Sequence, residues 1–238
     1  NADLLQDLLQ GPGLDVERHS GVAGRANLVA RIGGSDPTAP SLCLLGHTDV
    51  VPVNENGWRR DPFGGELIDG EVWGRGAIDM LNLTASMALT MRSLADSGFR
   101  PTGDLIFAAV ADEEAGATHG AKYLLAEHPD LVRSDYLITE SGGMPLERPD
   151  GIALPVLVAE RGVMWPRLTV RGAPAHGSLP YGTDNALIKA AEVVRRIAAW
   201  QGPVTVPGEW ATFVAGLGLP AEAVTALTTP GAIDSVLP

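Results

Sequence analysis

The apolar run at residues 105–111 constrains the fold of this 238-residue chain more than any other feature. The run (LIFAAVA) is nearly all apolar, which is typical of a strand buried on both faces of a sheet. Other strand-like runs lie at residues 14–19, 27–32, 41–51 and 136–139, and helical patterns lie at residues 4–9, 79–98 and 120–127. This alternation predicts an α/β domain with a mainly parallel central sheet flanked by helices.

The pattern changes after residue 160. Residues 165–171 alternate between apolar and polar side chains as a strand does, and residues 186–200 have the spacing of an amphipathic helix. Residues 202–238 are rich in Ala, Gly, Pro and Thr and predict no further element. We therefore expect an α/β domain over residues 1–160 and part of a smaller α+β domain over residues 161–238.

Composition and charge exclude several kinds of partner. The formal net charge of −12 disfavours nucleic acid, because phosphate binding requires clustered Lys and Arg. No apolar run reaches the roughly 18–20 residues that a membrane span needs, and no signal peptide follows Asn1. The single cysteine, Cys43, excludes an internal disulfide and a cysteine-based zinc cluster. We expect a cytoplasmic protein.

Two potential metal-binding side chains come at the end of the 41–51 strand. His47 and Asp49 lie two residues apart, so both point to the same side of a strand. The Asp49 carboxylate could then hold one imidazole nitrogen while the other nitrogen binds a metal. For this pair alone, a structural role is an equally good interpretation.

Carboxylates lie at the ends of three other predicted elements, one at the start of a helix and the others after strands. Asp79 lies where a helix begins, so it is either the N-cap, the better interpretation of this residue alone, or a bridge between two metals. Asp112, Glu113 and Glu114 follow the 105–111 strand and repel one another unless the loop is in water or a cation compensates them. With a cation, one Glu can bind the metal while its neighbour acts as a general base. Glu140 directly follows the 136–139 strand.

The shared placement of these residues matters more than any single motif. His47, Glu114 and Glu140 each follow an apolar strand, and binding sites of open α/β sheets form outside the carboxyl ends of the strands. Histidine together with carboxylates is a donor set for divalent metals such as zinc. The sequence therefore predicts a divalent metal site at this edge of the sheet.

Five segments together resemble the peptidase M20 family. This family includes acetylornithine deacetylases, succinyl-diaminopimelate desuccinylases, aminoacylases, glutamate carboxypeptidases and related dipeptidases. The resemblance implies a zinc-exopeptidase-like catalytic domain and a smaller lid or dimerisation domain. In chain order the segments are GHTDVVP at residues 46–52, WRRDPF at 58–63, WGRGAIDM at 73–80, DEEAG at 112–116 and TESGG at 139–143.

The resemblance also implies a role for each matching residue. It implies two Zn²⁺ ions, with Co²⁺ or Mn²⁺ as substitutes, and a homodimer formed through the lid domain. A histidine in the later segment GAPAHGS at residues 172–178 would reach across the dimer into the partner's site. The implied roles are His47, Asp79 and Glu140 on the first metal, Asp79 as the bridge, Glu114 on the second metal, Asp49 orienting His47, Glu113 as the general base, and His176 as the residue that crosses the dimer.

The chain departs from the family pattern in two ways. Leu81 and Asn82 follow Met80 where the family often has Lys and Gly, for which we expect only a packing consequence. The family's second metal also takes a histidine near the C-terminus of a longer chain, and no histidine follows His176 here. We therefore expect part of a longer protein, without the front of the first helix, much of the lid domain and the returning C-terminal segment, and inactive by itself.

The predicted reaction is dizinc-dependent hydrolysis of an amide or peptide bond in a dipeptide or N-acyl amino acid. A metal-bound water would attack, with Glu113 as its base. Residues 101–143 slightly favour the dipeptidase and carboxypeptidase branch. A lid-less zinc aminopeptidase is an alternative that residues 171–200 disfavour. A metal-poor homologue acting as a dimerising or binding protein is another, which the missing histidine leaves open.

Overall fold

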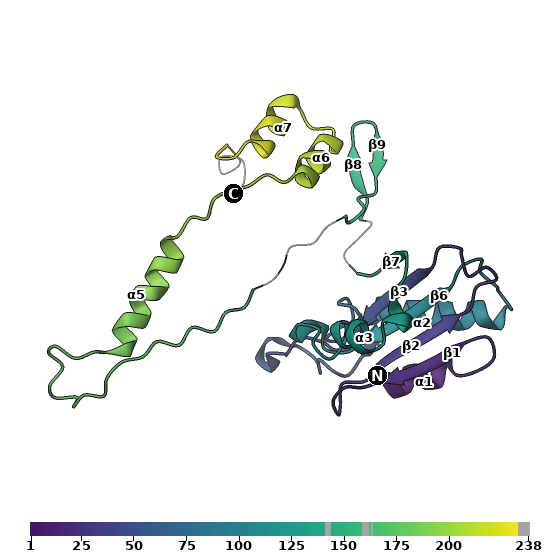
Figure 1. Cartoon of the computed structure of the whole chain (residues 1–238), viewed down its shortest axis with the longest axis horizontal. Helices are drawn as coiled ribbons and strands as arrows, with labels where there is room; N and C mark the ends of the chain where they lie inside the picture. Colours follow the sequence, from purple (N-terminus) through teal and green to yellow (C-terminus); the bar gives the residue numbers. More distant parts are fainter. Residues whose placement is uncertain (141–143, 159–161, 163, 233–238) are drawn as a thin grey trace. The chain divides into compact units, whose positions relative to one another are not determined.

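A twisted sheet forms the centre of the first of two structural units (Figure 1). The computed structural model describes residues 1–140, 144–158, 162 and 164–232. Its contacts divide the chain into Asn1–Ser141 and Gly142–Pro238. Within the described residues, the sheet of the first unit has the strand order β1, β2, β6, β3, β7. Its strands are β1 (Asp15–His19), β2 (Asn27–Ile32), β3 (Leu42–His47), β6 (Leu105–Val110) and β7 (Tyr136–Ile138).

The strand directions confirm the predicted, mainly parallel sheet. β3 pairs in parallel with β6 on one side and with β7 on the other. β2 is antiparallel to both β1 and β6, so it alone among these described strands runs in the opposite direction. The carboxyl ends of β3, β6 and β7 therefore lie at one edge of the sheet, as the predicted metal site requires.

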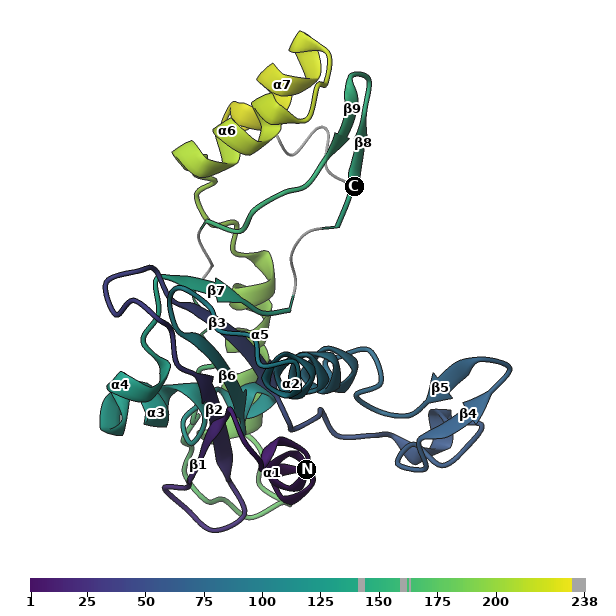
Figure 2. The same cartoon turned by 90° about the vertical axis from the view of Figure 1, so that its right-hand side faces the viewer.

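Helices cover both faces of this sheet, which confirms that the 105–111 run is buried on both sides (Figure 2). Leu105, Phe107 and Ala109 pack with α1 (Ala2–Leu9) and α2 (Leu81–Asp96). The alternate side chains of β6 pack with the face covered by α3 (Ala121–Glu127) and α4 (Pro129–Val132). The alternating side-chain direction of a strand explains how one apolar run serves both layers.

Cys43 lies in this core, which explains why it should be chemically inert. It is the only cysteine of the chain, and burial raises the pKa of its thiol to about 11. At pH 8 a thiol with that pKa has about a hundredfold less thiolate than one at the ordinary value. We expect iodoacetamide to leave the folded chain unlabelled under conditions that label the urea-unfolded chain completely. Mass spectrometry would measure this, and rapid labelling of the folded chain would contradict the packing of β3.

Several boundaries and environments differ from the sequence predictions. The 41–51 strand ends at His47, and the helix expected from Asp79 begins at Leu81. The β7 strand, expected to be buried, is an edge strand whose Leu137 side chain is 54% exposed. Edge position explains this, because within the described residues only β3 pairs with β7. Residues 52–76 form a loop that contains the hairpin of β4 (Glu66–Ile68) and β5 (Glu71–Trp73).

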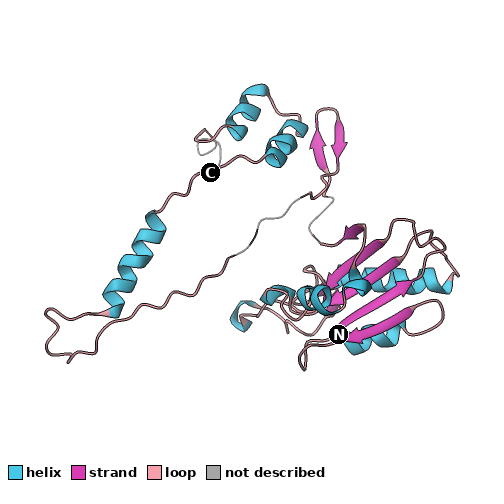
Figure 3. Cartoon of the chain, in the orientation of Figure 1, coloured by secondary structure: helices cyan, strands magenta, loops and turns pink. Residues whose placement is uncertain are grey.

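The second unit has more helix than the sequence predicted (Figure 3). Its elements are the hairpin of β8 (Leu146–Arg148) and β9 (Gly151–Ala153), α5 (Ala186–Ala199), α6 (Gly208–Gly216) and α7 (Ala221–Thr228). The expected strand at residues 165–171 is wrong, since no described strand lies beside it to pair with its backbone. The prediction of no element after residue 202 is also wrong, because Pro207 and Pro220 directly precede two alanine-containing helices.

One predicted helix of this unit is confirmed, and two other expectations fall on residues that the structure does not describe. The helix predicted at residues 186–200 is confirmed as α5, and the Asn185 side chain caps it by accepting the Leu187 N–H at 2.8 Å. The predicted domain boundary at residue 160 and the last three residues of the 139–143 segment lie outside the described residues. Among the helices that the structure describes, none is long and apolar enough to cross a membrane.

Candidate metal centre

His47 is the buried centre of a cluster of carboxylates at the carboxyl edge of the sheet. It is the last residue of β3 and is 2% exposed. Its backbone carbonyl accepts the hydroxyl of Thr84, in α2, at 2.8 Å. Its ring Nδ1 lies 2.9 Å from the carbonyl oxygen of Asp49, an acceptor that favours a proton on Nδ1. The Nε2 lone pair is then free to bind a metal.

Gly46 allows α2 to approach the strand that carries His47. A Cβ at this position would lie 2.5 Å from the Thr84 hydroxyl oxygen and 3.2 Å from the Thr84 Cα. The absence of a side chain at Gly46 therefore permits this close approach between β3 and α2. We expect Gly46→Ala to lower the free energy of unfolding by about 1–3 kcal/mol, because the added methyl group overpacks this contact. Urea denaturation would measure the loss, with Gly33→Ala as control, since a Cβ at Gly33 meets nothing within 4 Å.

Carboxylates from three other segments surround the Nε2 atom of His47. Asp79 Oδ1 lies 3.2 Å away, Glu140 Oε2 3.6 Å and Glu113 Oε2 3.9 Å. Ligand atoms of His47, Asp79 and Glu114 lie within 4.8 Å of one another, as do those of His47, Glu113 and Glu140. The structure thus brings together all the carboxylates that the sequence singled out as metal ligands or general base.

Asp49 contacts this cluster differently from the sequence prediction. Its carboxylate oxygens accept the backbone N–H groups of Glu113 and Glu114, each at 3.1 Å. Its Oδ1 atom lies 3.6 Å from Nδ1 of His47, beyond hydrogen-bond distance. The imidazole is therefore held by the Asp49 carbonyl, while the carboxylate holds the turn that follows β6.

Asp79 is not a helix cap, so that interpretation is wrong. The N-cap of α2 is Met80, and Asp79 precedes it. The peptide bond between these two residues is cis. The Asp79 side chain is 64% exposed at the surface of the cluster, with one oxygen near His47. The carboxylate therefore faces both His47 and solvent.

The electrostatics of the cluster favour a cation. Burial lowers the pKa of His47, but a backbone hydrogen bond and the charge of Glu140 outweigh it, so that this pKa is raised. Burial raises the pKa of Glu114, and neighbouring carboxylates raise it further. The pKa of Glu140 is raised mainly by burial, against the effect of His47. Burial and gathered negative charge together therefore disfavour ionised carboxylates in this cluster, and a bound cation would relieve both.

Glu114 also has a buried atom without a partner. Its Oε1 has no hydrogen-bond donor among the described residues. A buried carboxylate oxygen is costly unless a donor or a cation satisfies it. One imidazole nitrogen together with carboxylate oxygens is a donor set that zinc accepts, and cobalt and manganese accept it too. The residues present therefore fit a divalent metal.

Comparison with known families shows to which family the chain belongs. Residues 43–234 match the sequence model of peptidase family M20/M25/M40. The chain belongs to this family. The match continues into the second unit, so it covers more than the metal-binding cluster alone.

Named members of peptidase M20 are clearly similar in sequence. The succinyl-diaminopimelate desuccinylase of Methylobacterium nodulans is 37% identical over 191 residues, which are 77% of this chain and 46% of that protein. The protein of the same name from Rhodospirillum centenum is 33% identical over 203 residues, which are 83% and 51% of the two chains. This chain therefore spans about half the length of these relatives.

Solved structures of the M20 family show the same fold. An M20 metallo-carboxypeptidase from Sulfolobus solfataricus has a TM-score of 0.63 at 16% identity, and covers 94% of this chain and 51% of its own. A dipeptidase from Saccharomyces cerevisiae has a TM-score of 0.58 at 17% identity, and covers 98% of this chain and 55% of its own. At these identities the likeness supports the fold and not the substrate.

His176, predicted from the M20 resemblance to cross a dimer, lies in the second unit. Its side chain is exposed, and Nδ1 lies 2.7 Å from the Ser178 hydroxyl. Its role stays a prediction. The other histidines, His19, His119 and His128, belong to neither group of potential metal ligands found among the described residues.

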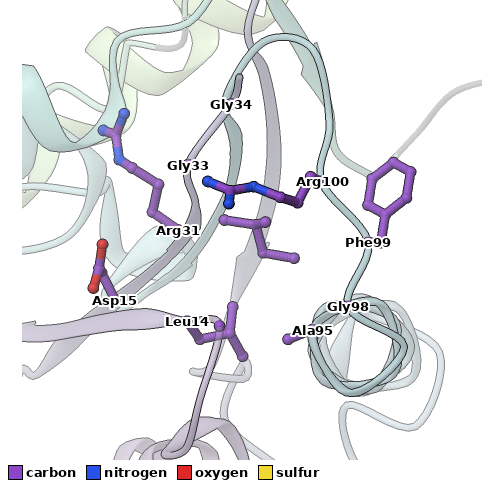
Figure 4. A pocket seen from close by; sticks show the side chains of 11 residues that line it. Leu14, Asp15, Arg31, Gly33, Gly34, Ala95, Gly98, Phe99 and Arg100 are labelled. Atoms are coloured by element: carbon purple, nitrogen blue, oxygen red, sulfur yellow. The ribbon is translucent and has the colours of Figure 1, made fainter. Parts of the chain in front are cut away.

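A pocket of about 480 Å³ lies apart from this M20-like centre (Figure 4). Its lining includes Arg31, Gly34 and Arg100, near the end of β2 where Ile32 pairs with Leu105, the first residue of β6. The metal-binding cluster lies at the other end of β6. Arg31 already forms an ion pair with Asp104. The pocket therefore adds nothing to the carboxylate centre.

Sequence reasoning missed the residues behind the Glu113–Glu114 turn. Asp112, first taken as one of three clustered carboxylates, is 4% exposed and pairs with Arg25 at 3.2 Å. Asn27 is fully buried beside it. The sequence signal that could have identified Asn27 is its polar side chain at the start of the mostly apolar 27–32 strand.

Proposed function

We propose that the full-length protein is a dizinc hydrolase that cleaves the amide bond of a small N-acyl amino acid or dipeptide. The observation that carries this proposal is the convergence of one buried imidazole and several carboxylates, including a Glu114 oxygen that has no partner among the described residues. Membership in peptidase M20 supports metal-dependent amide hydrolysis. The number and kind of the metal ions belong to the proposal.

The proximity of these side chains supports a proposed role for each residue. His47 and Glu140 would hold the first metal, Glu114 the second, and Asp79 both, with its two oxygens. Two zinc ions bound there would supply Lewis acidity, which activates water and polarises a carbonyl. Burial suits His47 to a fixed ligand position, whereas Asp79 is exposed enough to face a second ion.

Glu113 is suited to move the proton. Its carboxylate is 46% exposed and lies 3.9 Å from Nε2 of His47, at the border between the cluster and solvent. It would take a proton from the attacking water and deliver it to the leaving amine. Asp49 holds the Glu113 N–H, which fixes the backbone from which this carboxylate projects.

The sequence relatives favour an N-acyl amino acid as the substrate class. Relatives at 33–37% identity are named succinyl-diaminopimelate desuccinylases. The solved dipeptidase and carboxypeptidase at 16–17% identity inform the fold alone. We also propose that the second unit serves as a lid and dimerisation domain, and that His176 reaches the partner's site.

The experiment is metal analysis and an activity survey of the full-length protein. We expect about two zinc ions per chain, as in a two-metal hydrolase, and loss of turnover on chelation that added zinc reverses. The substrates are N-succinyl amino acids, N-acetyl amino acids and dipeptides, and we expect fastest hydrolysis of the first group. Protein without metal or amidase activity would instead support the binding-protein alternative. The 238-residue chain, tested in parallel, is expected to be inactive.

A further inference from the structure

We propose that Arg25 and Asn27 are positioning residues that set the direction of the Glu113 and Glu114 carboxylates, Arg25 through the buried Asp112 and Asn27 through the backbone of Ala111 and His119. The inference rests on the proposed metal-dependent function. Neither Arg25 nor Asn27 belongs to a group of potential metal ligands among the described residues. Both lie just before or within β2, on the antiparallel side of the sheet.

The turn after β6 has an unusual backbone. Asp112 has a φ of 68° and Ala117 a φ of 58°, both in the left-handed region that non-glycine residues rarely adopt. Such conformations persist at functional sites when surrounding contacts hold them in place. Glu113 and Glu114 lie between these two residues, so their directions depend on what holds the turn.

The Asp112 side chain closes this turn. One carboxylate oxygen accepts the His119 N–H at 3.1 Å. The other lies 3.2 Å from a guanidinium nitrogen of Arg25. The Asp112 carbonyl accepts the Ala117 N–H at 2.6 Å. A nearly fully buried carboxylate needs such partners, above all beside other negative charges.

Asn27 ties the two ends of the turn to β2. Its Oδ1 accepts the Ala111 N–H at 2.9 Å, and its Nδ2 donates to the His119 carbonyl at 2.8 Å. The ends also touch each other, since a Cβ at Gly120 would overlap the Ala111 carbonyl oxygen. The turn is therefore clamped at its base by the side chain of Asn27, which lies 84 residues before Ala111 and 92 residues before His119.

The side chains of Arg25 and Asn27, which we call the clamp, hold the base of the turn. Asp49 holds the two residues that follow Asp112. Asp49 accepts the N–H groups of Glu113 and Glu114, and the Arg25–Asp112 pair holds the residue just before them. A shift of Asp112 would therefore move the metal ligand and the general base together. The Arg25 cation also offsets a negative charge immediately behind the carboxylate cluster.

The test compares variants of the full-length protein. We expect Arg25→Ala to weaken zinc binding by about 10–100-fold, the usual effect of losing a residue that supports a metal ligand. We also expect kcat to fall with KM nearly unchanged, and amide hydrogen exchange at residues 113 and 114 to speed up in the metal-free protein. Arg25→Lys should restore most of these properties. The matched control is Arg18→Ala, because Arg18 also forms an ion pair, with Asp3, and has a similar exposure.

A double variant separates positioning from general stability. Asp112→Asn keeps an acceptor for the His119 N–H and tolerates the left-handed backbone, but carries no charge that needs Arg25. Arg25→Ala combined with Asp112→Asn should therefore bind zinc better than Arg25→Ala alone. If Arg25→Ala unfolds the protein, Arg25→Gln supplies the same exchange measurement, because it removes the cation that pairs with Asp112 and keeps a neutral hydrogen-bond donor on a longer side chain.

The outcomes distinguish this inference from the proposed function. Equal zinc affinity and equal exchange for Arg25→Ala and Arg18→Ala would overturn the positioning role. A wild-type protein that binds no zinc would overturn the proposed function, while exchange at residues 113 and 114 would still decide the clamp. Faster amide exchange at residues 113 and 114 together with weaker zinc binding, found in Arg25→Ala but not in Arg18→Ala, would support both the positioning role and the proposed function.

Discussion

Glu113→Gln in the full-length protein is expected to lower kcat about 10²–10⁴-fold and leave the zinc content unchanged. The amide has nearly the shape of the carboxylate but cannot accept a proton at neutral pH. The backbone should stay in place, because Asp49 binds the N–H of residue 113 and not its side chain. Turnover of an N-acyl amino acid and metal analysis of the same preparation measure both quantities.

The control for this variant is Glu127→Gln, an exposed Glu at the end of α3. It should have the kcat and zinc content of the wild type. Unchanged turnover in Glu113→Gln would remove this residue from the proposed role of general base. A loss of zinc would instead assign it to metal binding, which its place beside Glu140 and His47 also allows geometrically.

Asp79→Ala is expected to remove both metal ions and all measurable turnover. In the proposal this carboxylate is shared by the two ions, so its loss weakens both sites. Zinc content should fall from about two ions to fewer than one, and zinc should no longer raise the thermal midpoint, because a ligand stabilises only a protein that binds it. Metal analysis after dialysis and thermal unfolding with and without zinc test this.

Asp7→Asn is the matched control for Asp79→Ala, since Asp7 is an exposed acid on α1. It tests whether loss of one negative charge matters by itself. Retention of two zinc ions by Asp79→Ala would disprove the bridging role. Loss of a single ion would show that Asp79 belongs to one metal alone.

The sequence predicted the sheet and the cluster because both depend on local patterns. The run at residues 105–110 is typical of a strand covered on both faces, and parallel strands place their carboxyl ends together. His47, Glu114 and Glu140 therefore had to meet once β3, β6 and β7 were neighbours.

The clamp could not be predicted because it depends on pairing between distant segments. Arg25 and Asn27 reach the turn only because β2 lies antiparallel to β6, and no periodic pattern specifies that direction. The same holds for the exposure of β7, which reflects its place at the edge of the described sheet. The helices α6 and α7 were not predicted because residues 202–238 were assessed by their overall content of Ala, Gly, Pro and Thr. That content does not reveal two short helices, each preceded by proline.

The two backbone hydrogen bonds that Asp49 accepts hold the turn independently of the side chains at positions 113 and 114. Backbone N–H groups are common to nineteen of the twenty amino acids, so almost any side chain can replace Glu113 or Glu114 without loosening this attachment. The side chains at positions 113 and 114 can therefore change while these backbone attachments stay the same. Only proline would remove an attachment point, so the turn can accept new reactive groups on an unchanged backbone.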